Sequence, residues 1–395
     1  MERAQARTAA HGDGRGDRPR RGSDRRPPRR IPRRGPDRAR RDGASRQAVR
    51  GRMEVRMSFA TWKKEAAFTT TLLRRRPFSC LIQVTNRCNM ECSFCDFWPN
   101  PAPPKQELSL AEYRRVADEL AELGTFVISV EGGEPLARPD IVEIVRILSE
   151  KHITALFTNG WFVTEDKAKA LWDAGLVHGN VSIDYPEASR HDGKRRLAGT
   201  TDRAWKAVDL LRDTAPRGGK QVHVMTVLME DNWRDLESLL RQSEARGVGH
   251  QLTLLSIAGY RRGKEGPDKM PPVGVSEHVL ALWERYPHLR YFREYFARID
   301  AFLAQGAMPT CSAGKTGFNI DHVGNVSPCI ERIHESVGNV REASLGDLYR
   351  RLQDKQAEIT RCQQCWTACR GINQALGQGG SARSLFDLGT RMRTS

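Results

Sequence analysis

No stretch of this sequence approaches the roughly 20 consecutive apolar residues that span a bilayer. The N-terminus also lacks the hydrophobic segment that a secretory signal requires. These absences exclude a membrane-embedded or secreted protein, so we expect a cytoplasmic one. With 39% apolar and 28% charged residues, the 395-residue chain has ordinary globular composition and is long enough for one large core and a smaller domain.

Lysine and nearly all aliphatic side chains are missing from the first 50 residues. This stretch contains 17 arginines and 6 acidic residues, so +11 of the formal charge of +16 lies there and the rest of the chain is only mildly basic. Because such a composition cannot bury enough apolar surface to fold, we expect residues 1–52 to form a disordered basic tail. It is either a functional arm or translated upstream sequence, with the true start near Met53 or Met57. We favour upstream sequence, because high-GC coding sequence often yields Arg, Pro and Gly.

A fourth cysteine is missing beside the first cysteine motif, in which Cys88, Cys92 and Cys95 are spaced Cx3CxxC. Thiolates are the ligands that iron-sulfur clusters need, and three of them leave one iron of a 4Fe-4S cluster open. Structural zinc is the alternative, but it usually has four protein ligands. Nine cysteines in a reducing compartment also indicate metal binding rather than disulfides.

With Phe94 directly before its last cysteine, this motif resembles the signature of the radical S-adenosylmethionine (SAM) superfamily. A second motif, Gly132, Gly133, Glu134 and Pro135, follows an apolar run that is typical of a buried parallel strand. An ordinary strand-to-helix turn is the alternative for this second motif. The resemblance implies that the motif receives the amino group of SAM, with Glu134 as the carboxylate, while SAM chelates the open iron.

Apolar runs alternate with helical patterns in six steps of roughly 25 to 30 residues, which predicts a parallel α/β sheet. The expected strands are residues 78–84, 126–130, 153–157, 177–183, 222–229 and 251–257. The expected helices are residues 58–73, 109–123, 141–150, 164–174, 202–211 and 233–245. The resemblance implies a partial (βα)6 TIM-like barrel. Cys80 lies in the first strand, and we interpret it as a core residue.

Active sites of such barrels lie at the carboxyl ends of the strands. This rule nominates Thr158 and Asn159 after the third strand, and Ser182 and Asp184 at the fourth. The resemblance implies that residues at strands four and five approach the ribose and carboxylate of SAM, although turn formation or helix capping would equally explain Ser182 and Asp184. His191 lies in the polar stretch 190–196, which could border the substrate but is more typical of a solvated loop.

The remaining cysteines follow a helical, charged stretch near residues 276–305, and we expect them to form a separate small domain. They are Cys311, Cys329, Cys362, Cys365 and Cys369. Their spacing around Gly324 resembles the auxiliary-cluster domains called SPASM and Twitch, and a hairpin over residues 318–326 would place two of the cysteines at strand ends. Five cysteines fit the one-cluster Twitch version better than the two-cluster pattern. We favour the first four as ligands, with Cys369 able to replace Cys362 or Cys365, and zinc as the alternative.

The expected domain organisation has six parts. These are a tail (1–52), a helical arm (53–77), the barrel (78–270), a helical linker (271–310), the auxiliary-cluster domain (311–372) and a C-terminal tail (373–395).

The resemblance implies an enzyme with two 4Fe-4S clusters that cleaves SAM reductively to a 5′-deoxyadenosyl radical, which takes hydrogen from an unactivated carbon. The electron would come from an external flavodoxin- or ferredoxin-type donor. We expect a polar small molecule as the substrate rather than a peptide, because residues 1–77 do not resemble the leader-binding domain that peptide maturases often carry. Maturation of a ribosomally made peptide is the second hypothesis. A non-catalytic electron carrier or sensor whose tail binds nucleic acid is the third, which the glycine motif disfavours.

Overall fold

The computed structural model describes residues 59–259, 266–377, 386–387 and 390. The chain divides into residues 1–53 and residues 54–395, and the described residues all belong to the second unit. The expected tail over residues 1–52, the first six residues of the expected helical arm and most of the expected C-terminal tail lie outside the described residues. No helix in the described part of the chain is long and apolar enough to cross a membrane.

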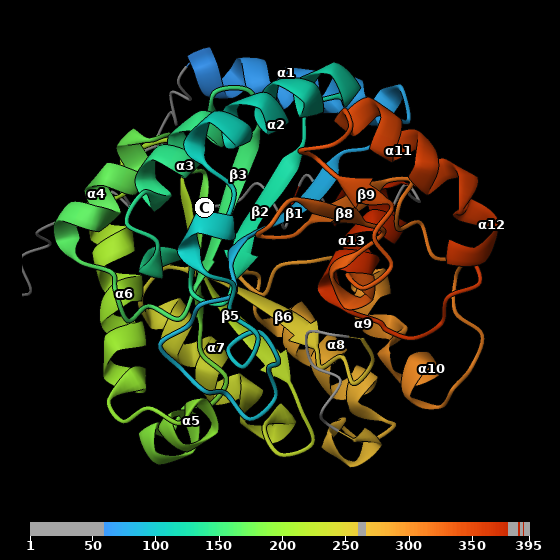
Figure 1. Cartoon of the computed structure of the whole chain (residues 1–395). Coiled ribbons are helices and arrows are strands. Elements are labelled where there is room, and N and C mark those ends of the chain that lie inside the picture. The colour runs from blue at the N-terminus through green and yellow to red at the C-terminus, as the bar shows by residue number, and fades with distance from the viewer. Residues whose placement is uncertain (1–58, 260–265, 378–385, 388–389, 391–395) are drawn as a thin grey trace, which may run out of the picture. The chain divides into compact units, whose positions relative to one another are not determined.

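Six parallel strands form the first part of one sheet, as the sequence predicts (Figure 1). They are β1 (Ser79–Thr85), β2 (Val127–Gly132), β3 (Ile153–Thr158), β4 (His178–Ser182), β5 (Gln221–Leu228) and β6 (Gly249–Leu254). Neighbours in sequence are neighbours in the sheet from β1 to β6, so the carboxyl ends of the strands face one edge. This arrangement brings the loops after the strands together, as a βα barrel requires.

Helices separate these strands and pack on their outer side (Figure 1). They are α2 (Leu110–Leu123), α3 (Ile141–Ser149), α4 (Glu165–Asp173), α6 (Thr200–Thr214) and α7 (Leu236–Ala245), while α5 (Ala188–Arg195) packs against α6. The largest apolar core lies between helices and strands and includes Ile82 of β1 with Leu120 of α2. Cys80 is fully buried in this core, which confirms its interpretation as a core residue.

The ends of α2 show how local sequence sets the helix boundaries. The Ser109 hydroxyl accepts a hydrogen bond from the backbone N–H of Glu112, and the Glu112 carboxylate accepts one from the Ser109 N–H. This reciprocal capping box satisfies two N–H groups that the first turn of a helix leaves free. Gly124, at φ +159, follows the last residue of the helix. The helix predicted over residues 109–123 is confirmed.

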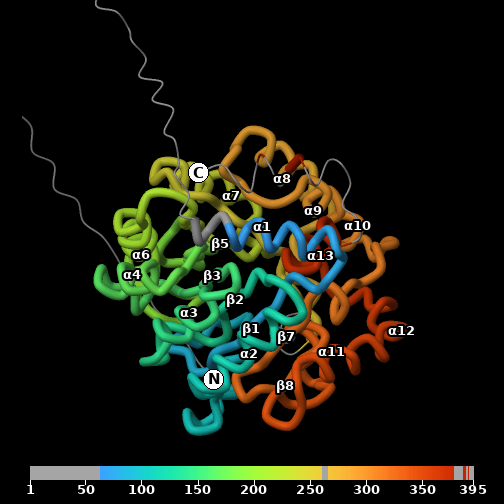
Figure 2. Tube along the Cα trace, turned by 90° about the horizontal axis from the view of Figure 1, so that it is seen from above, coloured from blue at the N-terminus to red at the C-terminus, as the bar shows by residue number. Residues whose placement is uncertain are grey.

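Helix α1 (Phe59–Leu73) crosses the amino ends of the strands, as the view from above shows (Figure 2). The hydroxyl of Thr71 accepts a hydrogen bond from Thr125 N–H just before β2, and Lys64 donates to the carbonyl of Ser149 at the end of α3. The ring of Phe68 packs edge-on against Phe78 just before β1. Helix α1 therefore closes the edge of the barrel opposite the loops that follow the strands.

The hairpin predicted over residues 318–326 is confirmed, and it continues the barrel sheet beyond β1. Strand β7 (Gly317–Ile320) pairs in parallel with β1, and β8 (Asn325–Ser327) and β9 (Gly338–Asn339) follow antiparallel. Gly324, at φ +95, makes the turn, and the Asp321 carboxylate accepts the N–H groups of Val323 and Asn325. Helices α11 (Leu345–Asp354), α12 (Gln356–Ile359) and α13 (Ala368–Gly377) complete this part.

Two segments differ from the helices and loops predicted for them. The helical stretch near residues 276–305 consists of α8 (Val275–Arg285), α9 (Arg293–Ala297) and α10 (Ile299–Leu303). Pro287 interrupts it, because the residue before a proline is pushed to extended backbone, and residues 288–290 then pair with His250 of β6. The polar stretch 190–196, expected as a solvated loop, forms most of α5 and buries His191 and Arg195 one turn apart.

Candidate active site

The three thiols of Cys88, Cys92 and Cys95 lie on the loop that follows β1. Burial, then the charge of Glu134, and then the charges of the other two thiols raise the pKa of Cys88 to about 12. This mutual influence means that the three sulfurs are close neighbours. Burial is also the main cause that raises the pKa of Cys92, and thiols whose ionisation is unfavourable alone fit a metal cluster, because coordination to metal deprotonates them.

An apolar wall surrounds the cysteine loop. It contains Met90, Phe94, Tyr185, Val227, Met229 and Leu255, with Trp161, Leu197, Ile257 and Met270 packed against it. Phe94 is 3% exposed. The backbone of the loop is held by the indole N–H of Trp98, which donates to the carbonyl of Cys92 at 3.2 Å, and by the N–H of Cys95, which donates to the same carbonyl. The wall limits the access of water to the three sulfurs.

The two glycines of the second motif bring the end of β2 against the backbone that leads into the cysteine loop. A Cβ on Gly132 would lie 2.2 Å from the carbonyl oxygen of Thr85, and one on Gly133 would lie 2.4 Å from that of Arg87. The N–H of Gly133 donates to Thr85 O at 2.7 Å, and the N–H of Glu134 donates to Arg87 O at 2.9 Å. Glycine is required here because two backbones meet, and the role of this motif toward SAM stays a prediction.

Glu134 is fully buried and connects the loops after β2 and β3. Its Oε1 accepts hydrogen bonds from Leu136 N–H at 3.0 Å and the Thr158 hydroxyl at 2.7 Å, and its Oε2 accepts one from Asn159 N–H at 2.7 Å. Burial raises the pKa of Glu134 above its ordinary value, although these hydrogen bonds oppose the shift. Pro135 begins the short 3-10 turn over Pro135–Ala137 that follows. The carboxylate thus braces the site, and its predicted contact with the SAM amine is untested.

Asn159 connects Glu134 to the cysteine loop. Its side-chain amide donates to the Asn89 side-chain oxygen at 2.9 Å and lies 3.9 Å from the Cys88 sulfur. The N–H of Met90 approaches the same sulfur at 3.4 Å. Glu134, Asn159 and Cys88 therefore form one connected series, as expected for residues at the ends of neighbouring strands.

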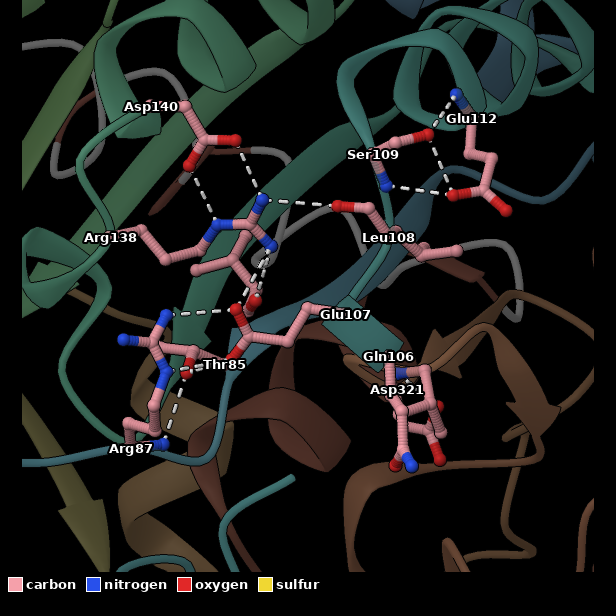
Figure 3. Close-up of polar contacts among 12 residues, drawn as sticks. Thr85, Arg87, Gln106, Glu107, Leu108, Ser109, Glu112, Arg138, Asp140 and Asp321 are labelled. Carbon is pink, nitrogen blue, oxygen red and sulfur yellow. Dashed lines mark hydrogen bonds and ion pairs between the residues drawn. The ribbon is translucent and has the colours of Figure 1, made fainter. Parts of the chain in front are cut away.

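A buried ion-pair network holds the end of β1 from the other side (Figure 3). The Glu107 carboxylate accepts hydrogen bonds from the Thr85 hydroxyl and from Arg87 Nε at 3.1 Å and Nη2 at 2.9 Å. Arg138 donates to the carbonyl of Val84 at 2.9 Å and pairs with Asp140 at 2.7 Å. This network fixes the strand end from which the cysteine loop departs.

Ser182 and Asp184 differ in their surroundings. Ser182 is half-buried at the end of β4, whereas Asp184 is fully buried and its carboxylate is bound within the protein. Its Oδ2 accepts from Arg195 Nη2 at 2.5 Å and Nε at 3.1 Å, and its Oδ1 accepts from Val227 N–H at 2.9 Å. Burial alone would raise the pKa of Asp184, but the charge of Arg195 and the hydrogen bonds from Val227 N–H and Arg195 outweigh it, so the pKa lies below its ordinary value.

His191 does not line an open surface, because its side chain is fully buried. Its Nδ1 accepts a hydrogen bond from the backbone N–H of Asp184 at 3.2 Å, which assigns the proton to Nε2. Burial, followed by the nearby charge of Arg195, lowers the pKa of His191 to about 4. The imidazole is therefore neutral near pH 7 and positions Asp184.

Arg195 was not predicted from the sequence to belong to the site. Its side chain contacts Asp184, lies 3.9 Å from the Cys92 sulfur through Nη1, and stands 5.4 Å from the centre of the Phe94 ring. The i, i+4 spacing from His191 in a polar run was the one signal available in the sequence. That signal is weak, because most charged runs lie in solvent.

The second cysteine set lines one cavity of about 40 Å³. Its lining includes Cys311, Cys329, Cys362, Cys365 and Cys369. Burial, followed by the charges of Cys365 and Cys311, raises the pKa of Cys329 well above its ordinary value. Among the described residues, no three His, Cys, Asp or Glu side chains are arranged around a point where one metal ion could bind. Converging thiols in a shared cavity fit a larger cluster, whose irons each take one thiolate.

Cys369 differs from the other four cysteines of the cavity because it lies on a helix, α13, while they lie on loops. It packs against a small apolar cluster of Leu81, Phe97 and Ile330, against which Cys95 of the first motif also packs. This cluster therefore lies between the two cysteine sets. Burial is the main cause that raises the pKa of Cys311, Cys329 and Cys365, and the ligand set favoured from the sequence stays a prediction.

Two family profiles match the chain over these same regions. The radical SAM superfamily matches residues 82–242, and the SPASM iron-sulfur cluster-binding domain matches residues 311–366. The first match contains the cysteine loop and the glycine motif. The second contains four of the five cysteines that line the cavity.

Several proteins align with more than half of this chain. The chain is 26% identical over 292 residues to an AdoMet-dependent heme synthase of Nitratidesulfovibrio vulgaris, covering 68% of this chain and 77% of the relative. It is 27% identical over 305 residues to the mycofactocin maturase MftC of Mycolicibacterium smegmatis, covering 73% and 76%. It is 30% identical over 229 residues to a probable GTP 3′,8-cyclase of Methanopyrus kandleri, covering 57% and 70%.

Solved structures share the fold. The structure of Streptococcus suis SuiB bound to the precursor peptide SuiA superposes with a TM-score of 0.58 at 17% identity, covering 82% of this chain and 77% of SuiB. This likeness confirms the predicted barrel architecture, and the SPASM profile match identifies the C-terminal iron-sulfur domain.

Proposed function

The chain belongs to the radical SAM superfamily and carries a SPASM-type iron-sulfur domain, and on this premise we propose that it modifies a peptide substrate. It is an enzyme whose cofactors are SAM and 4Fe-4S clusters. The similarity to a mycofactocin maturase over 73% of this chain carries the proposal. The similarity to PqqA peptide cyclases adds to it. These relatives support the peptide hypothesis better than the small-molecule substrate that the sequence alone favoured.

The first cluster fits the loop after β1, where Cys88, Cys92 and Cys95 would hold three of its irons. When bound, the reduced cluster and SAM supply a radical that can remove hydrogen from an unactivated carbon. Glu134 and Asn159 hold the loops around this position through the hydrogen bonds given above. The apolar wall around Phe94 excludes water, which would otherwise compete as a reactant or hydrogen-bond partner.

A second cluster fits the cysteine-lined cavity, with Cys311, Cys329, Cys362 and Cys365 as its ligands. Arg370 lies beside them and donates to the carbonyls of Cys365 at 2.8 Å and Pro309 at 2.6 Å. A cluster there would either accept an electron from the substrate or support the structure. We also propose an external one-electron donor of the flavodoxin or ferredoxin type for the first cluster.

A haem-type porphyrin is the second candidate substrate. The similarity to heme synthases over 68% of this chain favours it. A porphyrin and a peptide both present unactivated C–H bonds, so the chemistry at the cysteine loop does not distinguish them. Direct identification of the hydrogen source does.

Deuterium transfer identifies the hydrogen source without knowledge of the substrate. The reconstituted enzyme, SAM and a strong reductant would be incubated anaerobically with an extract of the source organism grown on deuterated medium, separated by size into peptides and small molecules. We expect deuterium from the peptide fraction in 5′-deoxyadenosine, measured by mass spectrometry. Deuterium from the small-molecule fraction alone would contradict the peptide proposal, and a haem-type porphyrin in the active fraction would establish the second candidate.

The matched control replaces Cys88, Cys92 and Cys95 by alanine together. This variant should form no 5′-deoxyadenosine from either fraction, because it lacks the thiolates for the first cluster. Formation of 5′-deoxyadenosine by the control would mean that SAM is cleaved elsewhere.

A further inference from the structure

Helix α5 clamps the cysteine loop at two neighbouring points. The carbonyl of Lys194 accepts a hydrogen bond from the backbone N–H of Ser93 at 3.2 Å. The next residue, Arg195, reaches the adjacent Cys92 sulfur with Nη1 at 3.9 Å. The loop is therefore docked on the last turn of α5 by one backbone contact and one charged side chain.

The guanidinium of Arg195 is held in a fixed direction. Its side chain is 9% exposed, and its Nε and Nη2 bind the fully buried carboxylate of Asp184. Asp184 is fixed in turn, because Val227 N–H donates to its carboxylate and the Asn232 amide donates to its carbonyl at 3.0 Å. Two of the three guanidinium nitrogens are thus used for orientation, and the third is directed at the sulfur.

A buried ion pair of this kind needs a reason beyond stability. Removing two charges from water is costly, and an apolar pair of similar size is often as stable. The donors beside Cys88 are neutral, since they are the Met90 N–H and the Asn159 amide. Among the contacts described for the sulfurs of Cys88 and Cys92, only the contact between Arg195 and Cys92 involves a charged group. The difference points to an electrostatic role at Cys92.

We propose that Arg195 is a positioning residue for the 4Fe-4S cluster, and that its charge, directed at Cys92 by Asp184, raises the reduction potential of that cluster. The inference rests on the proposed ligation by Cys92. Reduction adds negative charge to the cluster, and a nearby cation in a medium of low dielectric stabilises the reduced form. Hydrogen bonds to the sulfurs and net charge are recognised determinants of such potentials.

The test is a redox titration of the full-length reconstituted protein followed by electron paramagnetic resonance. The potential is read from the component of the spectrum that changes when SAM is added, which separates the first cluster from the second. Arg195→Gln should lower the ratio of reduced to oxidised cluster about tenfold at a fixed applied potential, which for a one-electron couple is about 59 mV. Arg195→Lys retains the charge and should recover most of the loss.

Asp184→Asn provides the opposite change and the sharper test. It leaves the Arg195 cation without its anion, so the potential should rise above that of the wild type. A merely structural role of the pair would shift the potential of both variants in the same direction. Arg190→Gln is the matched control, because Arg190 lies on the same helix and pairs with Asp235 at 2.5 Å, and it should leave the potential unchanged.

Three results would overturn the inference. One is an unchanged potential in Arg195→Gln with full iron loading, and another is a shift of the same sign in Asp184→Asn. A third is weaker SAM binding in Arg195→Gln at unchanged potential, which would make Arg195 a SAM contact. Absence of any cluster from the wild-type protein would instead refute the proposed function, so the two failures are distinguishable.

Discussion

The two cysteine sets of this chain are built in opposite ways. The thiols of Cys88, Cys92 and Cys95 come from eight consecutive residues, and side chains from the ends of β3 and α5 contact their loop. The thiols of the auxiliary cavity come from separate segments on either side of the β7–β8 hairpin, from the loop before α13 and from α13 itself, which meet at one cavity. The first set is therefore a local motif that other loops brace, whereas the second set is produced by the fold.

This difference explains what could be predicted from the sequence. Cx3CxxC on one loop determines its own approximate geometry, so the first site could be recognised from spacing alone. The six alternating strands and helices also depend on local pattern, and they were predicted correctly. In contrast, the pairing of β7 with β1 joins residues more than two hundred positions apart, and no local pattern indicates it.

The same reasoning explains the error at α5. The run from Arg190 to Arg196 is strongly polar, and such runs usually lie in solvent. Here His191 and Arg195 are buried because Asp184 and the cysteine loop supply partners from other parts of the chain. A buried charge is specified by its partners, and here Asp184 and the cysteine loop both lie outside the polar run itself.

The largest effect expected from a single substitution is that of Gly133→Ala, which would disturb the backbone contact that supports the cysteine loop. The new Cβ would lie 2.4 Å from Arg87 O and 2.6 Å from Asn86 O, and backbone atoms cannot move aside as a flexible side chain does. We expect loss of the first cluster and a lower melting temperature, measured by iron content and circular dichroism. Gly346→Ala is the control, because it lies in α11 with its nearest neighbour at 3.8 Å. It should stabilise the protein by about 0.5–1 kcal/mol.

Single substitutions at the auxiliary cavity test which of its cysteines hold the second cluster. Cys362→Ala should reduce iron from about eight to about four atoms per chain, since the proposed second cluster takes four thiolates and would lose one of them. Cys369→Ala should retain both clusters, because Cys369 lies on α13 and packs toward Leu81 and Phe97. Loss of iron in Cys369→Ala, with iron retained in Cys362→Ala, would show that Cys369 rather than Cys362 is a ligand of the second cluster. One tightly bound zinc ion in place of the second cluster would establish the zinc alternative.

The smallest expected effect is a pH dependence of folding stability, which comes from buried histidines of the barrel. Burial is the main cause that lowers the pKa of His152, His178 and His191 to about 4 and that of His250 to about 3. In the unfolded chain these imidazoles bind protons below about pH 6.5, while the folded protein binds them only near pH 4 or below. Stability should therefore be complete above about pH 6.5 and decrease as the pH falls toward 4.

Thermal melts across this pH range measure the effect. His152→Gln should flatten the dependence, because it removes one titrating group while an amide can replace its contacts with Phe126 N–H and Ala117 O. A melting temperature that stays constant from pH 7 to pH 4.5 would contradict the assignment of neutral, buried histidines.

The central claim is that the local motif cleaves SAM and that the auxiliary cavity is not needed for that step. Its most direct test is to quantify 5′-deoxyadenosine from the reconstituted wild type, from the variant lacking Cys88, Cys92 and Cys95, and from the variant lacking Cys311, Cys329, Cys362 and Cys365. The account predicts 5′-deoxyadenosine from the wild type and from the second variant, and none from the first. 5′-Deoxyadenosine from the first variant, or none from a fully loaded wild type, would contradict it.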